Sequence, residues 1–556
     1  MTSPDRIDAY HFYEREWDGY DELLSAFEWE VPDRFNMARY ACDRWADGGE
    51  RVAVYATDGE GTERYSFERL RAAADAVASS LQAAGVERGD RVGINARQRP
   101  ETVIAHLACW KLGAVSVPLS TLFGTDALRY RLEDAGAIAC FVDGSNAGTL
   151  RSVAGGLPDL ETVIAIGDAD PTGEERRFES VAAGEGAFET ARTDPEDDAI
   201  LIYTSGTTGD PKGVLHAHRV LLGNLPLFVT GFCDLEINES DVFWTPSEWA
   251  WVATLFDVVF PALFYGAPIV AYTGDESFDP ATAMGVIERY DVTNFFAPPT
   301  ALRMMEQLPD PGRWDVDSVR CVPSGGESLG ETITEWAADV FDGAAVHEGY
   351  GQTEANMIVG DCTALTPSKP GKIGPRAPGH EIAILDPETA EPTVETGEVG
   401  EIAVRYEGDP VCFKEYWNKP ERTDRKVQDG WLLTEDLGTL DGDGYVEFKS
   451  RKDTVIISAG YRIGPVEIEE ALAKHPAVAD AGVIGVPDDR RGEVPKAFVV
   501  PAAGHEPSGE LTRRLKRDVR DRLAEYEYPR EIAFIDELPK TSSGKVRRAS
   551  LEEEFA

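Results

Sequence analysis

The stretch YTSGTTGDPKGV (residues 203–214) decides how the rest of the chain is interpreted. The residues just before it, AILIY (199–203), form an apolar, β-prone run that predicts a buried strand. Glycines let backbone N–H groups approach a polyphosphate, hydroxyls donate further hydrogen bonds, and a lysine adds positive charge. The stretch therefore predicts a phosphate-binding loop after a strand. The residues expected to contact the phosphates are Thr204, Ser205, Gly206, Thr207, Thr208, Gly209 and Lys212.

The spacing of this loop separates it from the commonest nucleotide-binding motif. Gly206-x-x-Gly209-x-x-Lys212-Gly213 does not satisfy the Walker A pattern GxxxxGK[ST], and a polar surface loop is the plain alternative. The stretch resembles the signature of the acyl-adenylate-forming (AMP-binding) enzymes, which include acyl-CoA synthetases, adenylation domains of peptide synthetases and luciferases. The resemblance covers nearly the whole chain and is greatest to short- and medium-chain acyl-CoA synthetases. It implies ATP, Mg²⁺ and coenzyme A as ligands.

Segments along the chain alternate between strand and helix patterns. We expect strands at 52–56, 91–95, 114–118, 160–166, 292–297 and 318–323, and helices at 65–85 and 101–112. This alternation predicts an α/β fold with parallel sheets flanked by helices, whose ligands collect at the carboxyl ends of the strands. Residues 381–386 and 401–406 alternate with period two and predict an antiparallel β piece, while the polar residues 168–198 predict a loop.

Length and charge predict two domains. At 556 residues the chain is too long for one core. Residues 451–556 carry 18 basic and 20 acidic side chains, a net charge of −2, whereas the remainder carries −44. We therefore expect a large N-terminal domain (1–450) and a small, mobile α+β C-terminal domain (451–556) that meets an anionic ligand.

The bulk composition limits the partners and the compartment. The net charge of −46 and the low lysine content, 14 of 54 basic residues, suggest a protein adapted to high salt and argue against nucleic acid or an anionic membrane as partner. Seven cysteines without a CxxC pair fit a reducing cytoplasm. The N-terminus lacks the apolar core of a signal peptide, and the apolar window 252–272 predicts a buried helix–turn–strand rather than a membrane span. The sequence leaves open whether the protein forms a homo-oligomer.

Residues 350–354 (YGQTE) follow a strand-like run at 344–347 and an expected turn at 348–349. Glu354 supplies a hard oxygen that suits Mg²⁺ opposite a phosphate loop, and we expect Thr204 and Glu354 to contact the metal. The resemblance implies that the whole segment holds the nucleotide, with Thr353 near the α-phosphate. The residues so assigned are Glu348, Gly349, Tyr350, Gly351, Gln352 and Thr353.

Residues 324–327 (SGGE) follow an expected strand. Adjacent glycines allow a flat base to lie against the backbone, and the resemblance implies that adenine packs on Gly326 and Glu327. A plain glycine turn is an equally good interpretation of these residues.

A third group of residues is expected around the ribose and the domain junction. Asp436, in GWLLTEDLG (430–438), can accept two hydrogen bonds from neighbouring hydroxyls. The resemblance assigns ribose contacts to Asp436 and Arg451, a phosphate contact to Arg462 and the pivot of the small domain to Asp453. Taken singly, each of these residues could form an ordinary surface ion pair.

Lys545, in PKTSSGKVRR (539–548), follows a short run of small residues that predicts a flexible tip. Its expected task is to bridge the attacking carboxylate and the α-phosphate, where charge grows in the transition state; a basic tail without function is the alternative. With Lys212, Thr353 and Glu354 it completes the catalytic set. The resemblance also implies coenzyme A contacts from Ala459, Gly460, Tyr461 and Arg491.

The acyl pocket is the least determined part of the sequence. Candidates are Trp249, Trp251, Phe296 and Ala297, although core packing explains these residues equally well. Acetate-specific relatives carry a tryptophan at the position of Gly351. Glycine there predicts a longer pocket, suited to a short- to medium-chain fatty acid or to an aryl acid such as benzoate.

These features together predict an ATP-dependent acid:CoA ligase. It would form an acyl-AMP with release of pyrophosphate and then transfer the acyl group to coenzyme A with release of AMP. An enzyme that loads a separate carrier protein is an alternative within the same family. A catalytically silent nucleotide-binding protein would be expected to have lost Lys545, Glu354 or Asp436, and all three are present.

Overall fold

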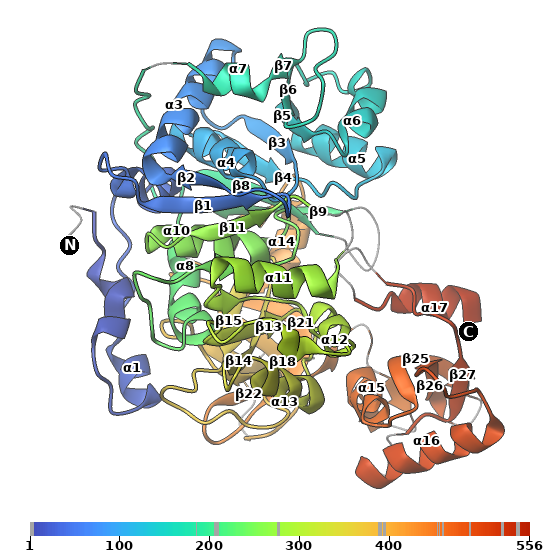
Figure 1. The fold of residues 1–556 in the computed structure, drawn as a ribbon. Helices are drawn as coiled ribbons and strands as arrows, with labels where there is room; N and C mark the ends of the chain where they lie inside the picture. Colours follow the sequence, from blue (N-terminus) through green and yellow to red (C-terminus); the bar gives the residue numbers. More distant parts are fainter. Residues whose placement is uncertain are drawn as a thin grey trace.

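The computed structural model describes residues 5–184, 186–204, 211–274, 278–386, 392, 396–452, 454, 456–458, 461–488, 491–523, 528–540 and 545–555. Four sheets are formed within these residues. Three of them belong to a large N-terminal α/β domain, and the fourth lies in a smaller C-terminal domain at the lower right of Figure 1.

The first large sheet carries the start of the candidate phosphate loop. Its central strands run parallel, because helices connect them across the faces of the sheet. Only β8 and β9, and β9 and β19, pair antiparallel among its described strands. In spatial order the strands are β19 (Glu415–Tyr416), β9 (Lys212–Ala217), β8 (Asp198–Thr204), β4 (Val115–Pro118), β3 (Arg91–Asn95), β5 (Ala137–Asp143), β6 (Thr162–Ile166) and β7 (Arg176–Arg177).

The second large sheet carries the YGQTE and SGGE segments. Its interior strands are also parallel, and antiparallel strands close both edges. In spatial order the strands are β15 (Ala355–Gly360), β14 (Ala345–Gln352), β13 (Cys321–Gly325), β12 (Asn294–Phe295), β10 (Phe243–Trp244), β11 (Ile269–Tyr272), β1 (Val52–Thr57) and β2 (Glu63–Ser66).

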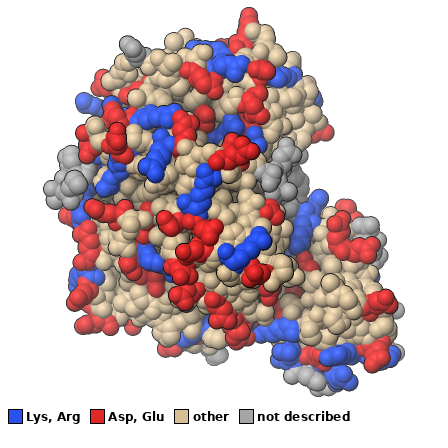
Figure 2. Space-filling model, viewed as in Figure 1, with Lys and Arg blue, Asp and Glu red and all other residues tan. Residues whose placement is uncertain are grey.

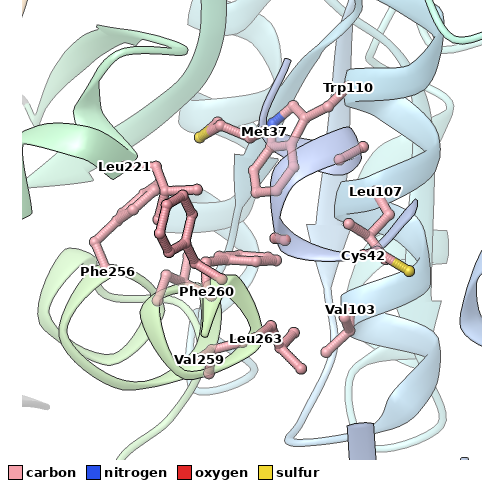
Figure 3. Close-up of a cluster of buried hydrophobic side chains, with 14 of the residues drawn as sticks. Met37, Cys42, Val103, Leu107, Trp110, Leu221, Phe256, Val259, Phe260 and Leu263 are labelled. Carbon is pink, nitrogen blue, oxygen red and sulfur yellow. The ribbon is translucent and has the colours of Figure 1, made fainter. Parts of the chain in front are cut away.

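One apolar core joins both large sheets and the helices between them. Figure 3 shows Trp110 of α4 (Pro100–Leu112) facing Phe260 of α10 (Phe260–Phe264), with ring centroids 4.5 Å apart. The Trp110 indole N–H donates to the Ala199 carbonyl of β8 at 2.9 Å. Burial of large aromatic rings therefore fixes β8 against the helices that lie between the two large sheets.

The remaining helices flank these sheets. The helical segments of the large domain are η1 (Asp8–Glu14), α1 (Tyr20–Ala26), α2 (Met37–Ala41), η2 (Asp43–Trp45), α3 (Phe67–Ala83), α5 (Thr125–Ala135), α6 (Ala147–Ala154), α7 (Phe178–Ala182), α8 (Val220–Leu227), η3 (Phe228–Phe232), α9 (Val252–Thr254), η4 (Leu255–Val259), α11 (Pro280–Tyr290), α12 (Pro299–Glu306), η5 (Pro311–Arg313), α13 (Glu331–Val340) and α14 (Pro420–Lys426). Among the helices of the described residues, none combines the length and the apolar character needed to cross a bilayer.

A third, smaller sheet contains the predicted antiparallel β piece. β17 (Ile382–Leu385) pairs antiparallel with β18 (Gly400–Arg405), which confirms that prediction. β18 continues to β21 (Trp431–Leu440), β22 (Tyr445–Arg451) and the edge strand β16 (Gly374–Pro375), and β20 (Val427–Gln428) pairs with β21. This sheet brings the segments around Asp436 and Arg451 together.

In its described residues, the C-terminal domain contains the fourth sheet and three helices. Its strands are β23 (Ile456–Ser458), β24 (Tyr461–Ile463), β25 (Val478–Asp488), β26 (Gly492–Pro501) and β27 (Glu531–Phe534), and its helices are α15 (Pro465–Ala473), α16 (Gly509–Arg522) and α17 (Arg548–Phe555).

On the face shown in Figure 2, acidic side chains are spread over both domains with basic ones among them.

Three local predictions were wrong. The helix expected from residue 65 begins at Phe67, because residues 63–66 pair with β1 and the Ser66 hydroxyl accepts a hydrogen bond from the Arg69 N–H. The expected loop at 168–198 contains β7 and α7, because α7 buries Phe178 and Val181. The expected turn at 348–349 is the middle of β14, whose backbone pairs there with β13.

Candidate active site

The ends of the candidate phosphate loop lie opposite each other. β8 ends at Thr204 and β9 begins at Lys212, and these two residues are antiparallel partners. The residues predicted to grip phosphate between them, Ser205, Gly206, Thr207, Thr208 and Gly209, lie outside the described part of the chain. Thr204 and Lys212 therefore mark where that segment meets the sheet.

Lys212, Glu354 and Tyr416 form one cluster at this point. The Tyr416 hydroxyl donates a short hydrogen bond to Glu354 Oε1. The Lys212 ammonium donates to the same hydroxyl at 3.3 Å, and its Nζ lies 3.9 Å from Glu354 Oε1. The structure thus brings the predicted lysine and the predicted metal ligand together, and adds a tyrosine that sequence reasoning missed.

The electrostatics of this cluster keep Glu354 ionised. Burial raises its pKa, but the charges of Lys426 and Lys212 and the Tyr416 hydrogen bond outweigh burial and hold the pKa below its usual range. Burial lowers the pKa of Lys212, and the charge of Glu354 partly offsets this effect. Burial and the charge of Glu354 both raise the pKa of Tyr416. Glu354 is therefore a buried carboxylate beside two ammonium groups.

Lys426 is the second residue that sequence reasoning missed. It ends α14, is only 4% exposed, and donates to the Thr434 carbonyl at 3.3 Å. Its ammonium also lies 3.6 Å from Glu435 Oε2. A buried lysine that pairs with an acid near a predicted phosphate site indicates a functional residue. The sequence could not predict this burial, because Lys426 stands among acidic and basic residues that are typical of an exposed segment.

Asp436 and Arg451 meet at the predicted ribose position. They are antiparallel partners on β21 and β22, and Arg451 Nη1 lies 3.7 Å from Asp436 Oδ1. The Tyr350 hydroxyl donates to Asp436 Oδ2 at 2.8 Å. Burial raises the pKa of Asp436, opposed by Arg451 and the Tyr350 hydrogen bond. A carboxylate held by its neighbours in this way is oriented before any ligand arrives.

The rest of YGQTE is fixed through its backbone and its amide. The His216 ring N–H (Nε2) donates to the Thr353 carbonyl at 2.7 Å, and Gln352 Nε2 donates to the Thr434 carbonyl at 3.1 Å. Burial lowers the pKa of His216 to about 4, so the ring is neutral. The segment is thus tied to β9 on one side and to β21 on the other.

SGGE and Glu348 lie side by side on β13 and β14. Ser324 pairs with Glu348, and Gly325 pairs with Gly349. The Glu348 carboxyl accepts a hydrogen bond from the Leu329 N–H at 3.3 Å, and burial raises its pKa to about 8. A neutral carboxyl can donate as well as accept, which suits the edge of a purine base.

The side chain of Lys545 lies beside Gly326. Gly326 has φ +91°, and a Cβ placed there would lie 3.8 Å from Cε of Lys545. Lys545 also lies close enough to Asp436 for its charge to lower the pKa of that acid. The Lys545 side chain therefore lies near two residues that are more than a hundred positions away from it in the sequence.

The two domains contact each other beside SGGE. The Ser328 hydroxyl donates a short hydrogen bond to Glu470 of α15, and Lys474 pairs with Glu331 at 3.3 Å. Arg303 Nη1 lies 3.4 Å from Glu327 Oε2, which holds the predicted adenine segment from α12. α15 therefore packs over the segment expected to carry the base.

The remaining C-terminal predictions are only partly described. Asp453, Ala459 and Gly460 lie outside the described residues, as do the side chains of Tyr461 and Arg462. Arg491 is exposed at the turn between β25 and β26, where its backbone N–H donates to Asp488 Oδ1 at 2.9 Å.

The acyl-pocket candidates are divided between buried and partly exposed positions. Trp249 and Phe296 are buried in the apolar core, and Phe296 lies 5.5 Å from Phe232 between ring centroids. Ala297 is buried too, and its N–H donates to the Pro323 carbonyl at 3.2 Å. Trp251 is partly exposed and packs edge-on to Phe123 at 6.3 Å.

Gly351 is required by a close backbone approach. A Cβ at this position would lie 2.1 Å from the backbone nitrogen of Met357, far inside any real contact distance. Met357 has φ +48° at an irregularity between β14 and β15. The space beside Gly351 is therefore filled by β15, so the glycine by itself does not lengthen a pocket.

Comparison with known proteins identifies the family. The sequence profile described as AMP-binding enzyme matches residues 42–417, and the profile of the AMP-binding enzyme C-terminal domain matches residues 467–545. An uncharacterized acyl-CoA ligase of Bacillus subtilis (strain 168), YtcI, is 34% identical over 94% of this chain and 96% of its own length. The mitochondrial acyl-coenzyme A synthetase ACSM3 of Mus musculus is 33% identical, with 96% and 92% covered. The crystal structure of the anthranilate CoA ligase AuaEII in complex with anthranoyl-AMP superposes with a TM-score of 0.86 at 28% identity, covering 94% of this chain and 98% of that one. The chain belongs to the family of AMP-binding enzymes.

Proposed function

We propose that this protein is an ATP-dependent acid:CoA ligase. The observation that carries the proposal is the meeting of Lys212, Glu354, Asp436 and the tip residue Lys545 around one site. Separate parts of the chain, from β9 to the segment before α17, supply these residues. Relatives named acyl-coenzyme A synthetase along nearly the whole length support the same reaction.

The reaction has two steps. An oxygen of the substrate carboxylate attacks the α-phosphorus of ATP, the bond to the β-phosphate oxygen breaks, and pyrophosphate leaves with its electron pair. The sulfur of coenzyme A then attacks the acyl carbon, loses its proton, and AMP leaves. The first step needs positioning and stabilisation of negative charge more than covalent help from the protein.

Each residue has a proposed role in these steps. Lys212 and Lys545 neutralise the negative charge that grows on the phosphates, and Lys545 offsets the repulsion between the phosphates and the attacking carboxylate. Asp436 and Arg451 hold the ribose, Glu348 contacts the base and Thr353 lies near the α-phosphate. The role that we propose for Arg462 is a contact to a phosphate. The loop residues between Thr204 and Lys212 supply the remaining phosphate contacts.

A magnesium ion fits the donor set that we propose for it. No cluster of three or more acidic, histidine or cysteine ligands occurs among the described residues. Mg²⁺ bound with a nucleotide takes one or two carboxylates, phosphates and water instead of a full protein cage. The ionised Glu354, with Thr204 opposite Lys212, matches this need, and the ion would offset charge on the phosphates of ATP.

The small domain completes the second half of the cycle in this proposal. We place the boundary between residues 450 and 451 and the pivot at Asp453. Rotation would withdraw Lys545 and present Ala459, Gly460 and Tyr461 to the pantetheine arm, with Arg491 on a coenzyme A phosphate. The exposed position of Arg491 supports its access to such a phosphate.

The substrate that we propose is a short- to medium-chain fatty acid. An aryl acid is the second candidate, because the solved relative that superposes with a TM-score of 0.86 is named as an anthranilate CoA ligase. Loading of a separate carrier protein is the third possibility that the experiment distinguishes.

We also propose that the protein works in a salt-rich, reducing cytoplasm. The net charge of −46 and the seven buried, reduced cysteines support this setting. Because salt screens repulsion among acidic side chains, the unfolding temperature should rise from 0.1 to 2 M KCl. An unfolding temperature that falls over this range would contradict the proposed salt adaptation.

The central experiment is pyrophosphate release from ATP with acids from acetate to decanoate and benzoate, with and without coenzyme A. Release that requires an acid, and that turns over only with coenzyme A, supports the ligase and names its substrate. Release that stalls after one turnover with coenzyme A present indicates a carrier protein as acceptor. Release of free phosphate without any acid contradicts the proposal.

A further inference from the structure

The strand that carries Asp436 is interrupted by a bulge. Glu401 and Ala403 of β18 pair with Leu437 and Leu433 of β21, so the residues Thr434–Asp436 of β21 face a single residue of β18 (Ile402). Glu435 in the middle of this bulge has φ +65°, a left-handed conformation that non-glycine residues rarely adopt. Bulges of this kind re-aim side chains beside active sites, and strain persists only where surrounding contacts enforce it.

Glu401 supplies the main enforcing contact. Its side chain is 3% exposed, and its Oε1 accepts a hydrogen bond from the backbone N–H of Glu435 at 2.9 Å. Its Oε2 accepts from the ammonium of Lys452 at 2.8 Å. A buried carboxylate therefore joins the strained residue to the chain that follows β22.

A backbone hydrogen bond also connects Glu435 with Lys452. The Lys452 N–H donates to the Glu435 carbonyl at 2.7 Å. The Glu435 carboxylate lies 3.6 Å from both Lys426 and Arg451, and so holds the arginine that faces Asp436. A backbone hydrogen bond, an ion pair and the bridge through Glu401 thus tie the bulge to Arg451 and Lys452, which directly follow the proposed domain boundary.

We propose that Glu401 is a positioning residue for nucleotide binding, which fixes the Asp436 bulge and couples it to Lys452 at the domain junction. The inference rests on the proposed function, because it assigns the ribose to Asp436. Glu401 does not touch the nucleotide in this proposal. It acts by keeping the Asp436 carboxylate and the Arg451 guanidinium in the orientation that the ribose hydroxyls require.

The test measures AMP binding by calorimetry together with the KM for ATP and kcat of acid-dependent pyrophosphate release. The variants are Glu401→Gln, Lys452→Met and the double variant. Each single change should weaken AMP binding and raise the KM for ATP roughly 10- to 100-fold, the range for a lost hydrogen bond to a charged group. The kcat should change by less than about threefold, because the reacting groups are untouched.

The double variant and a rescue variant distinguish a positioning role from a general effect on stability. The double variant should be no worse than either single variant, because the two side chains share one interaction. Lys452→Arg should restore AMP affinity to within about threefold, because it keeps the charge. The matched control is Lys369→Met, which removes a cation paired with Asp441 at 3.0 Å at the opposite end of the β21–β22 hairpin and should leave AMP binding unchanged.

The outcomes distinguish the two proposals. Wild-type protein that binds AMP but releases no pyrophosphate with any acid contradicts the ligase, while the AMP affinities still test Glu401. Unchanged AMP affinity in Glu401→Gln and Lys452→Met overturns the inference even if the ligase is active. Additive losses in the double variant also overturn it.

Discussion

Tyr416→Phe tests the arrangement of the candidate site most directly. The change removes one hydroxyl, which donates to buried Glu354 and lies 3.3 Å from the Lys212 ammonium. A hydrogen bond to a charged group contributes about 1.5–3 kcal/mol, which corresponds to roughly 10- to 100-fold. We therefore expect the kcat/KM for ATP to fall by that factor.

The ring itself should stay in place, so stability should change little. Phenylalanine keeps the edge-on packing against Phe413, whose ring centroid lies 5.0 Å away. The loss of one donor should also raise the pKa of Glu354, because the hydroxyl is one of the groups that lower it. The acid limb of the pH profile should accordingly move to higher pH.

The assay is acid-dependent pyrophosphate release at saturating acid, with ATP varied at several pH values. The control is Tyr406→Phe, since the Tyr406 hydroxyl donates to the Lys414 carbonyl at 2.8 Å and its ring also packs edge-on to Phe413. If Tyr416→Phe stays within about threefold of both wild type and this control, the tyrosine does not support Glu354 and the reasoning fails.

Three further changes test other parts of the site. Lys545→Ala should lower acid-dependent pyrophosphate release by about 100-fold or more, yet lower thioester formation from synthetic acyl-AMP by less than about tenfold; equal losses would show that Lys545 serves both steps. Gly351→Ala should lower the free energy of unfolding in urea by roughly 1–3 kcal/mol, because its Cβ would lie 2.1 Å from the Met357 nitrogen, and an unchanged midpoint would refute this close approach. Glu348→Gln should flatten the pH dependence of the unfolding temperature. In the folded protein the Glu348 pKa is raised from 4.5 to about 8, so its contribution to stability is present below pH 4.5 and is lost as the pH rises through about 8. Parallel curves for wild type and Glu348→Gln between pH 4.5 and 8.5 would contradict that pKa.

Much of the fold could be predicted because its signals are local. The apolar run at 199–203 became β8, and the alternating runs at 381–386 and 401–406 became an antiparallel pair. The failures were also local in origin. Gly349 suggested a turn but lies within β14, where a Cβ would come 3.0 Å from the Met357 sulfur, so glycine there serves close packing.

The amino-acid sequence by itself determined the family, and it predicted a phosphate-binding stretch together with the acids and lysines expected around it. Side-chain chemistry and strand periodicity are properties of neighbouring residues, so they can be read along the chain. Only the tertiary structure decided that Tyr416 donates to Glu354, that Lys426 is buried, and that Glu401 accepts a hydrogen bond from the bulge that carries Asp436. Those contacts depend on sheet order, register and bulges, which join residues far apart in the sequence and leave no local pattern.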